Sequence, residues 1–211
     1  MVNVLIVAAT ETELKAFLPL EFEHDKVSLV SAVLGVGKVA SMKLRHLLSR
    51  YQFDLVLLVG SCGSKDFSSG TVVSPSCLFD FEAISKLNIE RKDLPYMSAG
   101  DMNDSSFSNV ISVEVSQFSP NFSRPQNIRA LGGIVYDMEA YSVAEVCFKN
   151  NVPFDVLKIV VDGREDEIRT LSEYLQFEAI LYKNNTSHLR AMTRERVTSI
   201  PALLHDVNSR F

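Results

Sequence analysis

The sequence is poor in cysteine, in basic charge and in long apolar runs, and each shortage excludes a class of protein. Its three cysteines, Cys62, Cys77 and Cys147, include no closely spaced pair, which argues against a disulfide framework or a zinc site and favours a reducing cytoplasm. The net charge of −5 argues against a nucleic-acid partner, because such surfaces need basic residues. No apolar run approaches the roughly 20 residues that span a membrane. No basic segment precedes the first strand, so we expect no signal peptide and a soluble, cytoplasmic protein.

The residues that are present predict an α/β fold. Of the 211 residues, 46% are hydrophobic, which is enough for one sizeable core. Apolar, β-branched segments predict strands at 2–9, 28–34, 55–59, 71–74, 133–136 and 153–161. A short helix is expected to begin at 10–13, and further helices are expected near 37–51, 139–150, 170–183 and 186–208. This alternation predicts a single domain over residues 1–211, with a central mixed, twisted sheet flanked by helices on both faces.

Two parts of this pattern need comment. In the helix expected at 37–51, the predicted inward face consists of Val39, Met42, Leu44, Leu47 and Leu48. The segment from about Cys77 to Asn127 carries Ser, Asn and Asp clusters and several prolines. It is interpreted as loops with a strand or helix among them.

Carboxylates and a glycine-rich turn follow several predicted strands, where open α/β sheets bind their ligands. These features are Glu13, the Gly60-Ser61 turn, the pair Asp137 and Glu139, and Asp162. Each also has a purely structural interpretation. Thr10-x-x-Glu13 is a capping box, the glycines permit a tight turn, acids suit a helix start and Asp162-Gly163 is a common turn pair. Position alone leaves both interpretations open.

Taken in their order, these segments resemble the nucleoside phosphorylase/nucleosidase superfamily, most closely its hydrolase branch, the methylthioadenosine/S-adenosylhomocysteine nucleosidases. About half of the chain carries the resemblance. The matching segments are Ala9-Thr10-Glu11-Thr12-Glu13, Gly35-Val36-Gly37-Lys38, Val59-Gly60-Ser61-Cys62-Gly63, Tyr136-Asp137-Met138-Glu139-Ala140 and Asn151-Val152-Pro153-Phe154 with the following Asp162. The resemblance implies a nucleoside phosphorylase-like fold, a homodimer, a place in methionine salvage, and chemistry that needs neither a metal nor an organic cofactor.

The resemblance also implies a role for each site residue. Glu139, beside Met138, would accept hydrogen bonds from the ribose hydroxyls, and Asp162 would protonate the departing purine as general acid. Glu13 would deprotonate the attacking water, with Ser61 and the cation of Lys158 holding it in place. The remaining members of the expected substrate-binding set are Asp137, Gly60 and Val161.

Water is favoured over phosphate as the nucleophile. Phosphorylase relatives bind phosphate through arginines, one directly before the Val-Gly-Ser-Cys-Gly turn, where this chain has Leu58. An apolar side chain cannot pair with a dianion. The first strand end, Ala8-Ala9-Thr10, also lacks the arginine of those relatives.

The chain departs from the hydrolase pattern at several positions. Lys158 replaces an arginine and so loses a planar fork, Val161 replaces a serine, and Asp137 replaces a glutamate. The middle segment is short, and no residue in it can be assigned to stack on the base. The leading hypothesis is hydrolysis of a purine nucleoside, with 5′-methylthioadenosine and S-adenosylhomocysteine as the candidate substrates. The alternatives are a phosphate-dependent purine nucleoside phosphorylase and a non-catalytic nucleoside-binding homologue.

Overall fold

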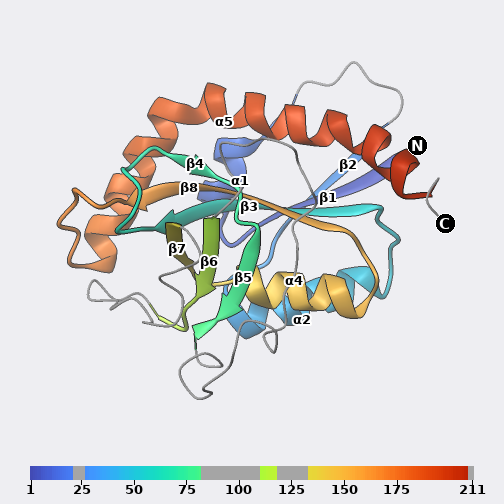
Figure 1. The fold of residues 1–211 in the computed structure, drawn as a ribbon, viewed down its shortest axis with the longest axis horizontal. Helices are drawn as coiled ribbons and strands as arrows, with labels where there is room; N and C mark the ends of the chain where they lie inside the picture. Colours follow the sequence, from blue (N-terminus) through green and yellow to red (C-terminus); the bar gives the residue numbers. More distant parts are fainter. Residues whose placement is uncertain (21–26, 82–109, 118–132, 209–211) are drawn as a thin grey trace.

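A computed structural model shows one mixed sheet with helices on both of its faces (Figure 1). The structure describes residues 1–20, 27–81, 110–117 and 133–208. The centre of the sheet consists of three parallel strands, β1 (Val2–Ala8), β3 (Leu55–Gly63) and β8 (Phe154–Asp162). This arrangement confirms the expected α/β class with a mixed central sheet.

The remaining strands extend the sheet in three directions. Strand β2 (Val27–Val33) lies parallel to β1 at one edge, and the two-residue β4 (Val72–Val73) pairs antiparallel with β8. On the other side, β7 (Gly133–Asp137) meets the end of β3 in an antiparallel contact and continues through β6 (Val110–Glu114) to β5 (Cys77–Asp80). Strands β5 and β6 therefore lie within the segment that the sequence left unassigned.

The two faces of the sheet carry different helices. Helices α1 (Glu11–Phe17) and α5 (Leu171–Asn208) cover one face, and α2 (Gly37–Leu48) and α4 (Ala140–Lys149) cover the other (Figure 1). Successive side chains of a strand point to opposite faces. Leu57 and Val59 of β3 accordingly pack with α1 and α5, whereas Val56 and Leu58 pack with α2 and α4.

Two expectations about the helices were wrong. Helix α5 is continuous, where the sequence suggested a break near 184–185. Polar side chains at this point bond back along the helix: Asn185 donates to the Leu181 carbonyl at 2.8 Å and Thr186 to the Tyr182 carbonyl at 2.6 Å. These i→i−4 bonds let polar residues remain inside a helix.

In α2 the inward face is narrower than expected. Leu44 is fully buried, but Val39 is 52% and Met42 is 72% exposed. Ala40 takes the buried position between them, so the contact with the sheet follows Ala40 and Leu44. The Val39 and Met42 assignments were therefore wrong, and both side chains lie on the outer surface of α2.

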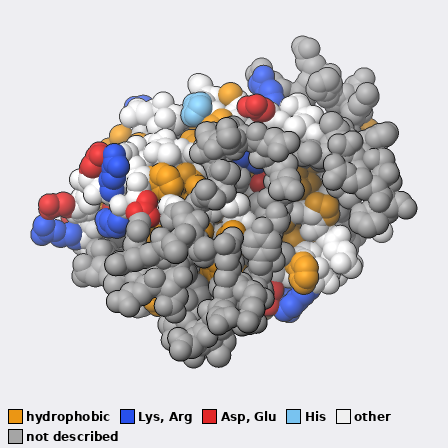
Figure 2. All heavy atoms as spheres, in the orientation of Figure 1, with side chains coloured by type: hydrophobic (Ala, Val, Ile, Leu, Met, Phe, Trp, Pro, Cys, Tyr) orange, Lys and Arg blue, Asp and Glu red, His pale blue; other side chains and the backbone are white. Residues whose placement is uncertain are grey.

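The described surface mixes its charges. In the view of Figure 2, acidic and basic side chains of the described residues stand next to each other, with exposed hydrophobic side chains between them. Among the described residues, none of the helices has an apolar run sufficient to cross a lipid bilayer.

Candidate active site

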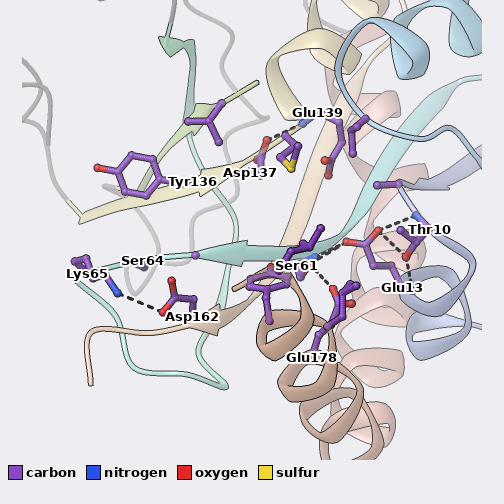
Figure 3. Close-up of a pocket in the computed structure, with 18 residues that line it drawn as sticks. Thr10, Glu13, Ser61, Ser64, Lys65, Tyr136, Asp137, Glu139, Asp162 and Glu178 are labelled. Atoms are coloured by element: carbon purple, nitrogen blue, oxygen red, sulfur yellow. Dashed lines mark hydrogen bonds and ion pairs between the residues drawn. The ribbon is translucent and has the colours of Figure 1, made fainter. Parts of the chain in front are cut away.

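A cavity of about 220 Å³ opens where the central strands end (Figure 3). Its walls come from the carboxyl ends of β1, β3, β7 and β8 and from the first turns of α5. Six of the nine expected site residues line it: Glu13, Ser61, Asp137, Met138, Glu139 and Asp162. These six residues therefore converge on one cavity, although the contribution of each residue differs.

Glu13 uses its two carboxylate oxygens for two purposes. Its Oε2 accepts from the Thr10 main-chain N–H at 2.9 Å, and the Thr10 hydroxyl accepts in turn from the Glu13 main-chain N–H at 3.2 Å. This is the capping box that begins α1. Its Oε1 accepts from the main-chain N–H of Ser61 at 2.9 Å and lies 3.0 Å from the Ser61 hydroxyl. The structural role and a position in the cavity therefore coexist in one side chain.

Gly60 contributes to the site because it has no side chain. A Cβ atom at this position would lie 2.7 Å from Oε1 of Glu13 and 3.2 Å from Nζ of Lys158, distances that are too short for non-bonded atoms. The missing side chain thus allows the carboxylate and the ammonium to approach strand β3 closely. Gly60 itself is not among the residues that line the cavity.

Lys158 and Glu139 form a buried ion pair behind the cavity wall. Lys158 is fully buried, and Glu139 is 3% exposed and faces the cavity (Figure 3). Burial alone would lower the pKa of Lys158, but the attraction of Glu139, Asp137 and Glu13 raises it. Burial raises the pKa of Glu139, and the Lys158 ammonium opposes that rise. Lys158 is therefore the buried cation that offsets the surrounding carboxylates, and its direct partner is Glu139.

Asp137 organises the start of α4. Its Oδ1 accepts from the main-chain N–H groups of Glu139 at 3.1 Å and Ala140 at 2.9 Å, and its Oδ2 accepts from the Ser112 hydroxyl at 2.6 Å. These bonds stabilise the N-terminus of α4 and fix the backbone that carries Glu139. Next to it, the Met138 carbonyl accepts from the Gly37 main-chain N–H at 2.8 Å, which ties the start of α2 to the site.

Asp162 lies in the cavity wall at the carboxyl end of β8. It is 7% exposed and pairs with the Lys65 ammonium at 3.3 Å (Figure 3). Burial raises the pKa of Asp162, and Lys65 partly counters this. A raised pKa suits a group that must give up a proton, whereas the lysine favours the ionised form.

Val161 takes no part in lining the cavity. Its side chain is fully buried in the core cluster that includes Leu157 and Ile159. Strand alternation explains this placement, because these residues differ by two and four positions and share one face of β8. The Val161 carbonyl accepts from the Ser69 hydroxyl at 2.6 Å, so its visible contribution is to the loop after β3.

Cys62 is buried in the core at the end of β3. The thiol is 1% exposed, and burial raises its pKa, which makes it a poor nucleophile. Among the described residues, no group of three His, Cys, Asp or Glu side chains is arranged to hold a metal ion.

Sequence reasoning missed Glu178, Tyr174 and Lys65, all of which line the cavity. Glu178 of α5 is 4% exposed, and its Oε1 lies 2.6 Å from the Ser61 hydroxyl. A signal was present in the sequence. Tyr174, Glu178 and Tyr182 follow one another at intervals of four, so they share one side of a helix, and an acid between two aromatic residues on an inward face is unusual.

The chain matches no protein-family model, but it is similar to curated nucleosidases. The 5′-methylthioadenosine/S-adenosylhomocysteine nucleosidase of Tolumonas auensis is 28% identical over 196 residues, covering 82% of each chain. The enzyme of the same name from Bacillus cytotoxicus is 26% identical over 186 residues, covering 77% of this chain and 78% of its own. The resemblance drawn from the sequence is thereby confirmed, and the chain is a divergent relative of these proteins.

A solved structure agrees with the fold. The 5′-methylthioadenosine nucleosidase of Arabidopsis thaliana, in its apo form, superposes with a TM-score of 0.71 and covers 95% of this chain and 96% of its own. The sequence identity is 17%. The architecture expected from the resemblance, a nucleoside phosphorylase-like sheet with flanking helices, is therefore confirmed.

Proposed function

We propose that the chain is a nucleosidase that hydrolyses the N-glycosidic bond of a purine nucleoside and releases the base. The observation that carries this proposal is that three of the buried carboxylates lining one cavity occupy three different settings. Glu13 is bonded to main-chain N–H groups, Glu139 is paired with a buried lysine, and Asp162 is paired with the half-exposed Lys65. Different settings let one type of side chain perform different tasks.

Each setting suits one step of the hydrolysis. Glu139, at the start of α4, would accept hydrogen bonds from the ribose hydroxyls, held there by Lys158. Burial raises the pKa of Asp162. This residue would give its proton to the purine as the glycosidic bond breaks. Glu13 would accept a proton from the water that attacks the sugar. A purine fits this scheme because its ring nitrogen can receive the proton of Asp162.

The surroundings of the cavity favour hydrolysis over phosphorolysis. Leu58, at the position where a phosphate-binding arginine was sought, is fully buried among apolar side chains. Of the described residues that line the cavity, Lys65 alone carries a positive charge, and it is already paired with Asp162. A phosphate dianion in the cavity would therefore face several carboxylates and a single lysine, Lys65, which is already paired with Asp162.

The finer parts of the proposal concern the substrate and the assembly. The similarity to curated nucleosidases supports 5′-methylthioadenosine or S-adenosylhomocysteine as the substrate, and with it a place in methionine salvage in the cytoplasm. We also propose a homodimer. Val36 lines the cavity and is 40% exposed, and the exposed Val39 and Met42 lie on the same helix, so a second copy could cover this apolar surface.

The deciding experiment measures free adenine by chromatography after incubation with 5′-methylthioadenosine. We expect release in phosphate-free buffer and no dependence on added phosphate. Asp162→Asn should lower kcat by about 10²–10⁴-fold, the usual contribution of a general acid, while Glu165→Gln, on the exposed loop nearby, should have no effect. Release that requires phosphate would favour the phosphorylase, and tight binding without product would favour a binding protein. Light scattering tests the dimer.

A further inference from the structure

The hydroxyl of Ser61 lies between two carboxylates that belong to different helices. It is 3.0 Å from Oε1 of Glu13 on α1 and 2.6 Å from Oε1 of Glu178 on α5 (Figure 3). A serine hydroxyl carries a single hydrogen, so it can donate to only one of these oxygens. The other contact is favourable only if that carboxyl group carries a proton and donates it to the serine oxygen. The geometry therefore requires a proton on Glu13 or on Glu178.

The hydrogen bonds of the two acids decide which one carries it. Glu13 accepts from the main-chain N–H groups of Thr10 and Ser61, and such donors stabilise the ionised form of a carboxylate. Among the described residues, no main-chain N–H donates to Glu178, whose side-chain neighbours are the Ser61 hydroxyl at 2.6 Å and the phenol of Tyr182. Burial raises the pKa of Glu178 to about 7. Of the two acids, Glu178 is therefore the one that carries the proton below a pH of about 7.

The charges around Glu178 point in the same direction. Glu13 on α1 and Lys158 on β8 both act on it, and the phenols of Tyr174 and Tyr182 face it from its own helix. The ammonium of Lys158 is already offset by Glu139, to which it is paired. Adding a second carboxylate charge beside Glu13 would leave this buried cluster with an uncompensated negative charge, which is costly away from water.

We propose that Glu178 is a positioning residue: in its protonated form it donates to Ser61 and so directs the Ser61 hydrogen onto Glu13, the base that accepts the proton of the attacking water. This inference rests on the proposed function, because it takes the role of Glu13 from there. When Glu178 loses its proton to solvent, it becomes the nearer acceptor for Ser61. Glu13 then loses one donor and gains a negative neighbour, so hydrolysis should slow as the pH rises through the pKa of Glu178.

The test compares Glu178→Gln with the natural protein over pH 5.5–9. The glutamine amide can donate to Ser61 at every pH, but it cannot release a proton. Because the natural side chain titrates at about 7, the ratio of the variant kcat to the natural kcat should rise about tenfold between pH 6 and pH 8. Glu195→Gln is the matched control, since this glutamate lies on the exposed side of the same helix, and its ratio should stay constant. A constant ratio for Glu178→Gln would overturn the inference.

A second measurement does not depend on hydrolysis. The pKa of Glu178 in the folded protein, about 7, lies above the ordinary glutamate value of about 4.3. The unfolded chain therefore releases this proton first, and the natural protein should lose stability relative to Glu178→Gln as the pH rises from about 4.3 to about 7, with no further change above. If the natural protein releases no adenine at any pH, both the function and this role fail. If it releases adenine but both pH dependences match those of the variant, only the role of Glu178 fails.

Discussion

Two helices of this chain begin with the same motif, a threonine followed three residues later by a glutamate, and only one of the two motifs faces the cavity. In α1, Thr10 and Glu13 exchange bonds of 3.2 and 2.9 Å between side chain and main chain. In α5, Thr170 and Glu173 exchange equivalent bonds of 3.1 and 3.0 Å. Locally the two capping boxes are the same structure.

They differ in what each carboxylate contacts beyond its own capping box. Glu13 is 4% exposed, and its Oε1 turns to Ser61 at the end of strand β3. Glu173 is exposed, and its Oε2 accepts main-chain bonds from Arg169 and Thr170, which lower its pKa. A capping box alone therefore says nothing about catalysis. Its position at the carboxyl end of a central strand supplies the second partner and the candidate role.

The largest expected contrast comes from replacing the glutamates themselves. Glu13→Gln keeps an oxygen for the capping bond but loses the basicity needed to accept a proton from water. We expect kcat for adenine release to fall by about 10²–10⁴-fold, while Glu173→Gln leaves it unchanged. The measurement is steady-state hydrolysis of 5′-methylthioadenosine, with circular dichroism to confirm that both variants fold. A Glu13→Gln variant as active as Glu173→Gln would leave Glu13 with the structural role alone.

The next contrast concerns the cations near the two motifs. Lys158 is fully buried against Glu139 and close to Glu13, whereas Arg169 near Glu173 is mostly exposed and pairs with Glu167 at the surface. Lys158→Met removes one partner of a buried pair and should cost about 3–5 kcal/mol of unfolding free energy. Arg169→Met should cause no measurable loss. Urea unfolding of the two variants decides this, and equal midpoints would contradict the assigned role of the buried ammonium.

Much of this arrangement could be predicted from the sequence because it follows from strand ends. Glu13, Ser61 and Asp162 lie at or just after the ends of the parallel strands β1, β3 and β8, whose carboxyl ends meet at one edge of the sheet. Glu139 follows β7, which meets the end of β3 in an antiparallel contact. The same logic of alternation could have excluded Val161. It shares parity with Leu157 and Ile159, so it belongs to the core face of β8, with Lys158 on the opposite face.

The rest depended on packing between distant segments. Glu178 is 117 positions from Ser61, and no local pattern states that α5 crosses above the end of β3. The predicted break near 184–185 also hid the continuity of this helix, in which asparagine and threonine side chains bond to preceding carbonyls and so remain inside the helix. Met42 was assigned inward from apolar character, which does not decide burial for a single surface residue.

The smallest contrast separates the structural role of the capping box from its place in the site. Thr10→Ala removes the hydroxyl that accepts from the Glu13 main-chain N–H and should lower the unfolding free energy by about 0.5–2 kcal/mol. Thr170→Ala removes the equivalent bond at the start of α5 and should lower stability in the same way. Only Thr10→Ala should also reduce kcat, by a few-fold, because Thr10 lines the cavity and orients Glu13, the proposed catalytic base. Thermal unfolding and adenine release measured on both variants test this, and a parallel loss of kcat in Thr170→Ala would show that helix stability, and not the position of Glu13, limits the reaction.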